Sequence, residues 1–233
     1  PVIEDTHDFE YQITSAIKKA TDNKIAKLGF WQGNGAAETR KDLAAAWQKL
    51  GEIYNVSTIN YATEKSLPAD LDVLIIVGPK EKFKDEELKA MDAFLMKGGS
   101  LVILADGVTV AQGLQASKND IGLNKILDGY GVKLNNNLVL DVNNGMASFS
   151  QGFVTFSTNY PYWPKVIKSG FDQNNIAVSR LESLVLPWAS SIDINSQKTT
   201  NLKTSFLAES SNRAMAVADN FSLSPQAEIK NGV

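Results

Sequence analysis

The sequence contains no cysteine and a single histidine, His7. The lack of cysteine excludes disulfides, thiolate nucleophiles, and zinc or iron–sulfur sites built on cysteine. A histidine-based catalytic triad or metal cage would depend on His7 alone, so we expect His7 to be an ordinary solvated side chain. The sequence therefore predicts neither a metal nor another cofactor.

Runs of one charge and long apolar runs are also missing. The 23 basic and 26 acidic residues give a net charge of −3, which makes nucleic acids and anionic membrane surfaces unexpected partners. No apolar stretch approaches the ~20 residues needed to span a bilayer, and there is no signal peptide. Because the chain begins with Pro1, we interpret it as a soluble piece of a longer protein, whose anchoring segments lie outside this sequence.

The first half of the sequence alternates between helical and extended patterns. Apolar residues recur with helical spacing in residues 9–20, 36–54 and 84–97. Extended patterns cover residues 25–31, 56–62, 73–78 and 100–106, and the last two are apolar enough for strands buried on both faces. Gly98 and Gly99 should end the third helix. This order predicts an α/β fold with a doubly wound, mainly parallel sheet.

The second half has a different pattern. A helix ending near Tyr130 and a strand running to Asp141 are followed by extended pieces that Asn, Gly and Pro separate. These pieces could extend the sheet at its edges or form a smaller β-rich subdomain. We expect an α/β core domain over residues 1–142 and a β-rich extension over 143–233, packed on the core or continuous with it.

Two loops of the first half stand where nucleotide-binding folds place phosphates. The stretch "VGPKEKFKDE" lacks the second glycine and the Ser/Thr of a phosphate loop, and Pro79 removes an amide donor. The loop "WQGNGAAETR" has Glu38 where a dinucleotide-binding fingerprint needs its third glycine. We therefore expect no nucleotide binding at either loop.

Signs of hydrolytic chemistry are weak. There is no G-x-S-x-G elbow, and an amidotransferase-type elbow would need a cysteine. Carboxylates such as Asp106, Asp141, Glu182 and Glu209 are scattered, and single acids at strand ends are usually turn formers. A hydrolase or sugar-processing enzyme of the same α/β class stays the alternative to a binding protein.

Binding is the function class that the remaining features favour. Open α/β sheets bind ligands beyond the carboxyl ends of their strands, and two aromatic stretches, "NYPYWP" and "LPWASS", should form loops that contact a partner. The candidate ligand- or partner-binding residues are Gln32, Asn34, Pro79, Asp106, Tyr162, Trp163 and Trp188. Alternatively, Tyr162 and Trp163 fill the seam between the sheet and a β subdomain.

The order and spacing of several blocks resemble a known family. The blocks are "FEYQITSAIKKAT", "KIAKLGFWQGNG", "LDVLIIVGPKEKFKDEELKAMDAFLMKGGSLVILAD", "LNKILDGYGVKLNNNLVLD", "LESLVLPWASSI" and "KTSFLAESS". From about Phe9 to Ser211 they look like the extracytoplasmic domain of GldG-like auxiliary components of ABC transporters. This family includes the gliding-motility-associated transporter subunit of Bacteroidetes.

The resemblance implies a flavodoxin- or amidotransferase-like core without catalytic machinery. It also implies a non-enzymatic domain on the periplasmic face of the inner membrane, held there by helices outside this sequence. Its partners would be the permease and ATPase subunits of an ABC transporter, with an exported or envelope molecule as a further ligand. Relatives tend to show a "GHGE"-like turn where Asn34 replaces the histidine, so the resemblance does not support a ligand or metal role for that turn here.

Overall fold

The structure is a computed structural model that describes residues 9–21, 24–151, 153–200 and 202–225. His7 lies outside the described residues. Contacts divide the chain into unit 1, Pro1–Ala105, and unit 2, Asp106–Val233, and each unit is described by itself. This division comes earlier than the domain boundary that we expected after residue 142, which stays a prediction.

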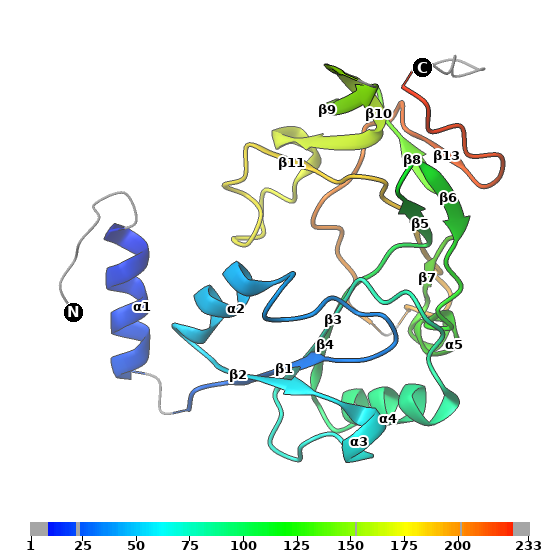
Figure 1. Cartoon of the computed structure of the whole chain (residues 1–233). Coiled ribbons are helices and arrows are strands. Elements are labelled where there is room, and N and C mark those ends of the chain that lie inside the picture. Colours follow the sequence, from blue (N-terminus) through cyan, green and yellow to red (C-terminus); the bar gives the residue numbers. More distant parts are fainter. Residues whose placement is uncertain (1–8, 22–23, 152, 201, 226–233) are drawn as a thin grey trace. The chain divides into compact units, whose positions relative to one another are not determined.

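Unit 1 contains a four-stranded parallel sheet (Figure 1). Its strands are β1 (Lys27–Trp31), β2 (Asn55–Ile59), β3 (Val73–Val77) and β4 (Ser100–Leu104). They lie in the order β2-β1-β3-β4, so the winding direction reverses between β1 and β3. Mixed α/β structure with a parallel sheet is therefore confirmed.

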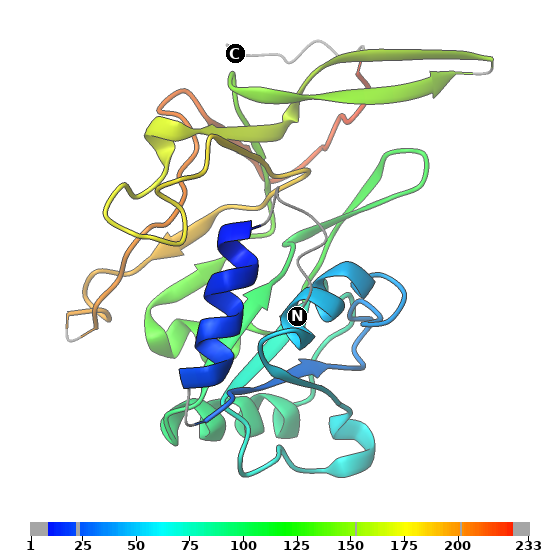
Figure 2. The same ribbon diagram turned by 90° about the vertical axis from the view of Figure 1, so that its left-hand side faces the viewer.

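Among the described residues of unit 1, one helix precedes these strands and three connect them. The helices are α1 (Phe9–Thr21), α2 (Ala44–Gly51), α3 (Tyr61–Glu64) and α4 (Asp85–Met96). Figures 1 and 2 show α2 and α4 on opposite faces of the sheet, as right-handed crossovers require when the winding direction reverses. Trp47 of α2 packs 5.7 Å from Phe30 of β1, while Leu88, Met91 and Phe94 of α4 are buried.

Two expectations for unit 1 were wrong in detail. The helix expected over residues 36–54 is reduced to α2, because the Asp42 carboxylate accepts a hydrogen bond from the Glu38 backbone N–H at 3.0 Å and fixes a turn before it. Strand β4 is not buried on both faces, since Val102 and Leu104 are 41% and 58% exposed. An edge strand lacks a neighbour on one side, and here it also lacks cover on one face.

Unit 2 consists mainly of antiparallel strands. They are β5 (Val108–Ala111), β6 (Gln115–Lys118), β7 (Val132–Leu134), β8 (Leu138–Leu140), β9 (Asn144–Gln151), β10 (Val154–Ile167), β11 (Ser183–Val185), β12 (Ile192–Ile194) and β13 (Met215–Val217). The short helices are α5 (Asn124–Leu127), η1 (Asp128–Tyr130) and η2 (Lys168–Gly170). Within the described ranges, none of β5–β13 pairs with the sheet of unit 1.

The sequence patterns were less accurate for unit 2. The hairpin β5–β6 was not expected, and the strand expected to run to Asp141 is divided into β7 and β8. The stretch "NYPYWP", expected to form a loop, belongs to β10. Strand β10 tolerates Pro161 and Pro164 because its register with β9 shifts between Tyr160 and Pro164.

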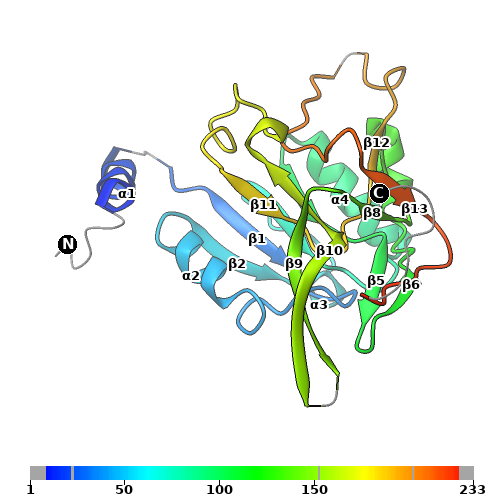
Figure 3. The ribbon, with the colours of Figure 1, turned by 90° about the horizontal axis from the view of Figure 1, so that it is seen from above.

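The core of unit 2 is an apolar cluster centred on β8, β9 and β10. Figure 3 shows the backbone of these strands. Its buried members are Val108, Leu138, Leu140, Ala147, Tyr160, Tyr162 and Leu223. These residues come from distant parts of unit 2, so its core depends on long-range contacts.

Candidate functional site

Three predicted site residues, Gln32, Asn34 and Pro79, lie just beyond the carboxyl ends of β1 and β3. This is where the strand order reverses and where open α/β sheets usually bind ligands. The Asn34 carbonyl accepts hydrogen bonds from the backbone N–H groups of Lys80 and Glu81, both at 2.9 Å. The two loops that would border a ligand are therefore bonded directly to each other.

The side chain of Asn34 strengthens this connection. Its Oδ1 accepts a hydrogen bond from Trp31 Nε1 at 2.9 Å, and its Nδ2 donates to Glu87 Oε2 at 3.1 Å. The backbone of Asn34 has a φ of 52°, a left-handed conformation that Asn tolerates better than most residues. Internal partners thus occupy both ends of this amide.

Glu87 is the buried carboxylate behind this loop. Its Oε2 also accepts the Lys84 backbone N–H at 2.7 Å, which braces the start of α4. Gln32 Nε2 donates to the Trp31 carbonyl at 3.0 Å, and Pro79 is buried. The polar groups at these strand ends therefore hold loop structure.

Asp106 begins unit 2, so its expected proximity to Gln32, Asn34 and Pro79 stays a prediction. Its backbone carbonyl accepts a hydrogen bond from Asn119 Nδ2 at 2.9 Å. This contact ties the start of unit 2 to the residue that follows β6.

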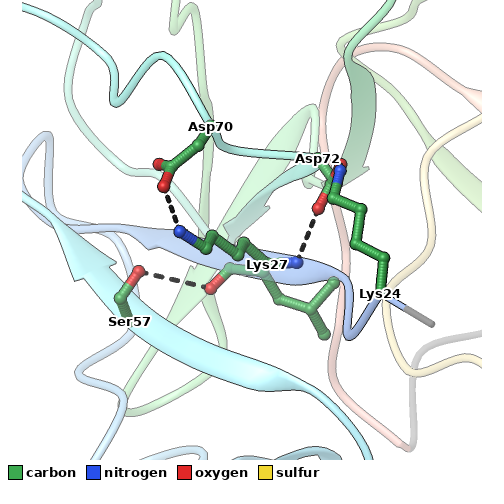
Figure 4. Close-up of polar contacts among 6 residues, drawn as sticks. Lys24, Lys27, Ser57, Asp70 and Asp72 are labelled. Carbon is green, nitrogen blue, oxygen red and sulfur yellow. Dashed lines mark hydrogen bonds and ion pairs between the residues drawn. The ribbon is translucent and has the colours of Figure 1, made fainter. Parts of the chain in front are cut away.

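Exposed ion pairs join the amino end of β1 to the amino end of β3 (Figure 4). These ends lie opposite the carboxyl ends described above. Asp72 accepts hydrogen bonds from Lys24 Nζ at 2.5 Å and from the Lys27 backbone N–H at 2.8 Å, and Asp70 pairs with Lys27 Nζ. These hydrogen bonds lower the pKa of both carboxyls, chiefly through Lys27 for Asp70 and Lys24 for Asp72. Such pairs align strand starts and contribute little stability each.

The predicted aromatic residues of unit 2 come together. The rings of Trp163 and Trp188 lie 5.5 Å apart and nearly perpendicular, and the Trp188 backbone N–H donates to the Tyr162 carbonyl at 2.8 Å. Tyr162 is buried, and both tryptophans are half-buried against the core cluster. Packing within unit 2 is their visible role, and contact with a partner stays a prediction.

Tyr160, which our site prediction omitted, lies at the centre of this packing. Its hydroxyl donates to the Leu223 carbonyl at 2.7 Å, which fastens the end of the described chain to β10. Burial raises the pKa of Tyr160 to about 12 and also raises the pKa of Tyr162. Both phenols therefore stay neutral at physiological pH, and the hydroxyl of Tyr160 acts as a structural hydrogen-bond donor.

Asp141 is a fully buried carboxylate that also shapes a loop. It accepts hydrogen bonds from the backbone N–H of Ser211 at 2.7 Å, from Ser211 Oγ at 2.5 Å and from the Asn143 backbone N–H at 3.0 Å. The expectation that isolated acids at strand ends form turns is confirmed here. Asp141 fixes the loop around Ser211 against the end of β8.

Next to this loop lies a hollow of about 340 Å³, which we call the polar hollow. Its lining includes Asn143, Ser169, Glu209, Ser210 and Asn212. The side chains of these residues have no hydrogen-bond partner in the described part of the chain. The polar hollow thus offers free donors and acceptors on a fixed loop, which the strand ends of unit 1 do not.

Our sequence analysis missed the polar hollow. The signals present were the paired asparagines at 143 and 144 and the run "ESSN" at 209–212, which are separated by more than sixty residues. Nothing in a single sequence indicates that two such polar clusters meet.

A second pocket, of about 240 Å³, lies within unit 1. Tyr61, Leu71, Phe94 and Lys97 contribute to its mixed apolar and polar lining. Phe94 can occupy its place because Gly99 has no side chain: a Cβ there would lie 2.3 Å from the Phe94 ring.

The described ranges contain neither a metal-binding cluster of side chains nor a membrane-spanning helix. Residues 9–21, 24–151, 153–200 and 202–225 contain no group of three or more His, Cys, Asp or Glu side chains placed to hold a metal ion. None of the helices in those ranges is both long and apolar enough to cross a bilayer.

Comparison with known protein families shows to which family this chain is related. The profile of a family described as an "ABC-type uncharacterized transport system" matches residues 26–232. The chain belongs to this family. The resemblance to auxiliary components of ABC transporters, inferred from the order of the sequence blocks, is thereby confirmed.

A curated protein that is similar to this chain is an uncharacterized protein of Borreliella burgdorferi. It is 26% identical over 228 residues, which is 94% of this chain and 44% of the relative. The chain thus spans less than half the length of that relative. Among solved structures, the mmIFT52 N-terminal domain has a TM-score of 0.51 at 18% identity, covering 73% of this chain and 69% of that chain, which indicates a similar fold.

Proposed function

We propose that the chain is the extracytoplasmic, non-catalytic domain of a membrane-anchored auxiliary protein of an ABC transporter, built on a doubly wound core. It would bind the permease or ATPase assembly, or an exported or envelope molecule, and a role in gliding motility is the narrower form of this proposal. The family match over residues 26–232 carries the proposal.

The buried carboxylates support a binding role over hydrolysis. Glu87 and Asp141 each accept hydrogen bonds from backbone N–H groups and hold loops in place. The polar hollow is the better candidate for ligand binding, because its side chains are free whereas those of Asn34 and Gln32 have internal partners.

Copurification tests the transporter assignment. The full-length protein, tagged and expressed with the permease and ATPase encoded beside it, should retain both subunits after detergent extraction. Retention of neither subunit would contradict the proposal.

Labelling tests the side of the membrane. Because this part of the protein has no cysteine, the exposed substitution Ser196→Cys gives the domain a single thiol, and any cysteine elsewhere in the full-length protein is replaced by serine. A membrane-impermeant maleimide should label that thiol in intact cells. Labelling only after lysis would place the domain in the cytoplasm.

A further inference from the structure

The most unusual surface of unit 2 is a two-stranded ribbon, formed by β9 and residues 154–160 of β10. Figures 2 and 3 show it running out beyond the other strands of unit 2. Residues 142–164 contain no charged side chain, although 21% of the whole sequence is charged. The ribbon is therefore a projecting and electrically neutral element.

The ribbon has two different faces, which its register defines. On one face Phe149 lies opposite Phe156, with ring centroids 6.0 Å apart, and Phe149 packs 5.1 Å from Tyr160 of the core. On the other face the hydroxyls of Ser148 and Ser157 are 2.8 Å apart. Those of Ser150 and Thr155 are 3.1 Å apart, so the hydroxyls of this face are paired with each other.

Apolar side chains continue to the far end of the ribbon, where they are uncovered. Phe153 at the turn is fully exposed, and Val154 beside it is 65% exposed. Met146, also 65% exposed, pairs with Asn159 at the opposite end of the ribbon and does not belong to the tip. Leaving an aromatic and a β-branched side chain in water at the tip is unfavourable. Such an apolar tip is the surface that a partner would cover.

The chemistry of the tip favours one kind of partner. A neutral ribbon has no charge to desolvate, and its paired hydroxyls can leave bulk water without losing their hydrogen bonds. Phe153 and Val154 are neighbours at the tip of a projecting ribbon, an arrangement that suits insertion into a soft and flat layer. We propose that the tip around Phe153 and Val154 inserts at the boundary between the headgroups and acyl chains of a lipid bilayer, without selecting for lipid charge.

Vesicle binding of the whole 233-residue chain tests this proposal. Since the chain lacks cysteine, Ser150→Cys carries one environment-sensitive fluorophore near the tip. Vesicles of phosphatidylcholine, and of phosphatidylcholine mixed with phosphatidylglycerol, should shift its emission to the blue equally. High salt should leave this shift unchanged, because screening acts only on charges.

Matched variants locate the contact. Combining Phe153→Ser with Val154→Ser should weaken vesicle binding about tenfold, in line with the lost apolar burial. Ile176→Ser removes an 87% exposed apolar side chain of unit 2 outside the ribbon and should have no effect. Circular dichroism should show every variant folded, as these side chains are exposed.

Three results would overturn the proposal: no shift with any vesicle, binding only to phosphatidylglycerol that salt abolishes, or a soluble dimer that Phe153→Ser dissociates. The last result would make the ribbon a protein interface. No transporter subunit takes part, so the outcome is independent of the copurification test.

Discussion

The two units are built on contacts of different range along the sequence. In unit 1, parallel strands are joined through helices that follow directly in sequence, as in β3-α4-β4. In unit 2, β7 pairs with β12 and β8 pairs with β13, so segments from opposite ends of the unit meet. Unit 2 should therefore depend more on a few groups at which several distant segments converge.

The largest effect should follow from Gly107→Ala in unit 2. A Cβ at Gly107 would lie 1.9 Å from the backbone oxygen of Asn135, so two backbone segments would have to separate. We expect a loss of about 4 kcal/mol in the free energy of unfolding. Urea denaturation measures it, with Gly129→Ala as the control, because a Cβ there meets nothing within 4 Å. Equal effects of the two substitutions would contradict this account.

Asp141→Ala should have the next largest effect. It leaves the Ser211 and Asn143 N–H groups without their buried acceptor, at a cost of about 3 kcal/mol. Asp141→Asn keeps one acceptor oxygen and should cost less, while Asp193→Ala, on an exposed residue, should be nearly neutral. Hydrogen exchange should show faster exchange at Ser211 in the alanine variant. Unchanged exchange there would mean that Asp141 does not hold this loop.

In unit 1, Asn34→Ala should cost about 2 kcal/mol. The substitution removes the partner of Trp31 Nε1 and one of the two donors to Glu87 Oε2, and it strains a backbone with a φ of 52°. Asn34→Gly removes the same hydrogen bonds but accepts the left-handed backbone, so it should cost less. Thermal unfolding measures both, and a cost for glycine that exceeds the cost for alanine would refute the strain contribution.

Most elements of unit 1 could be predicted from the sequence, because the patterns that specify them are local. The apolar run before Gly78 and the glycine pair after α4 each specify a neighbouring element, and β3 and α4 appear where the patterns predicted them. Helix α2 was shortened by one side chain, that of Asp42. A hydrogen bond of this kind competes with helix formation without changing the apolar periodicity.

Unit 2 shows where local signals fail. The asparagines at 135–137 form a visible cluster in the sequence, but their structural role depends on hydrogen-bond partners that are distant in the sequence. Asn136 Nδ2 donates to the Gly107 carbonyl at 2.8 Å, and Asn137 exchanges hydrogen bonds with Ser191 at 2.9 Å. Likewise, the polar hollow needs Asn143 beside Asn212. Pairings of this range require more than one sequence to infer.

The smallest effect concerns pH and the exposed ion pairs of unit 1. The pKa values of Asp70 and Asp72 in the folded chain lie below the ordinary 3.8, so these carboxylates take up protons more readily in the unfolded chain. The stability that Asp70 and Asp72 provide is therefore present above 3.8 and is lost as the pH falls from there through their lower pKa values in the folded chain. Replacing both Lys24 and Lys27 with Met should flatten the decline of the unfolding midpoint between about pH 5 and pH 3.

Lys49→Met, which removes an exposed pair with Glu52 at 3.6 Å, is the control. Parallel pH profiles for the double variant and the parent protein would show that the pairs align the strands without stabilising unit 1.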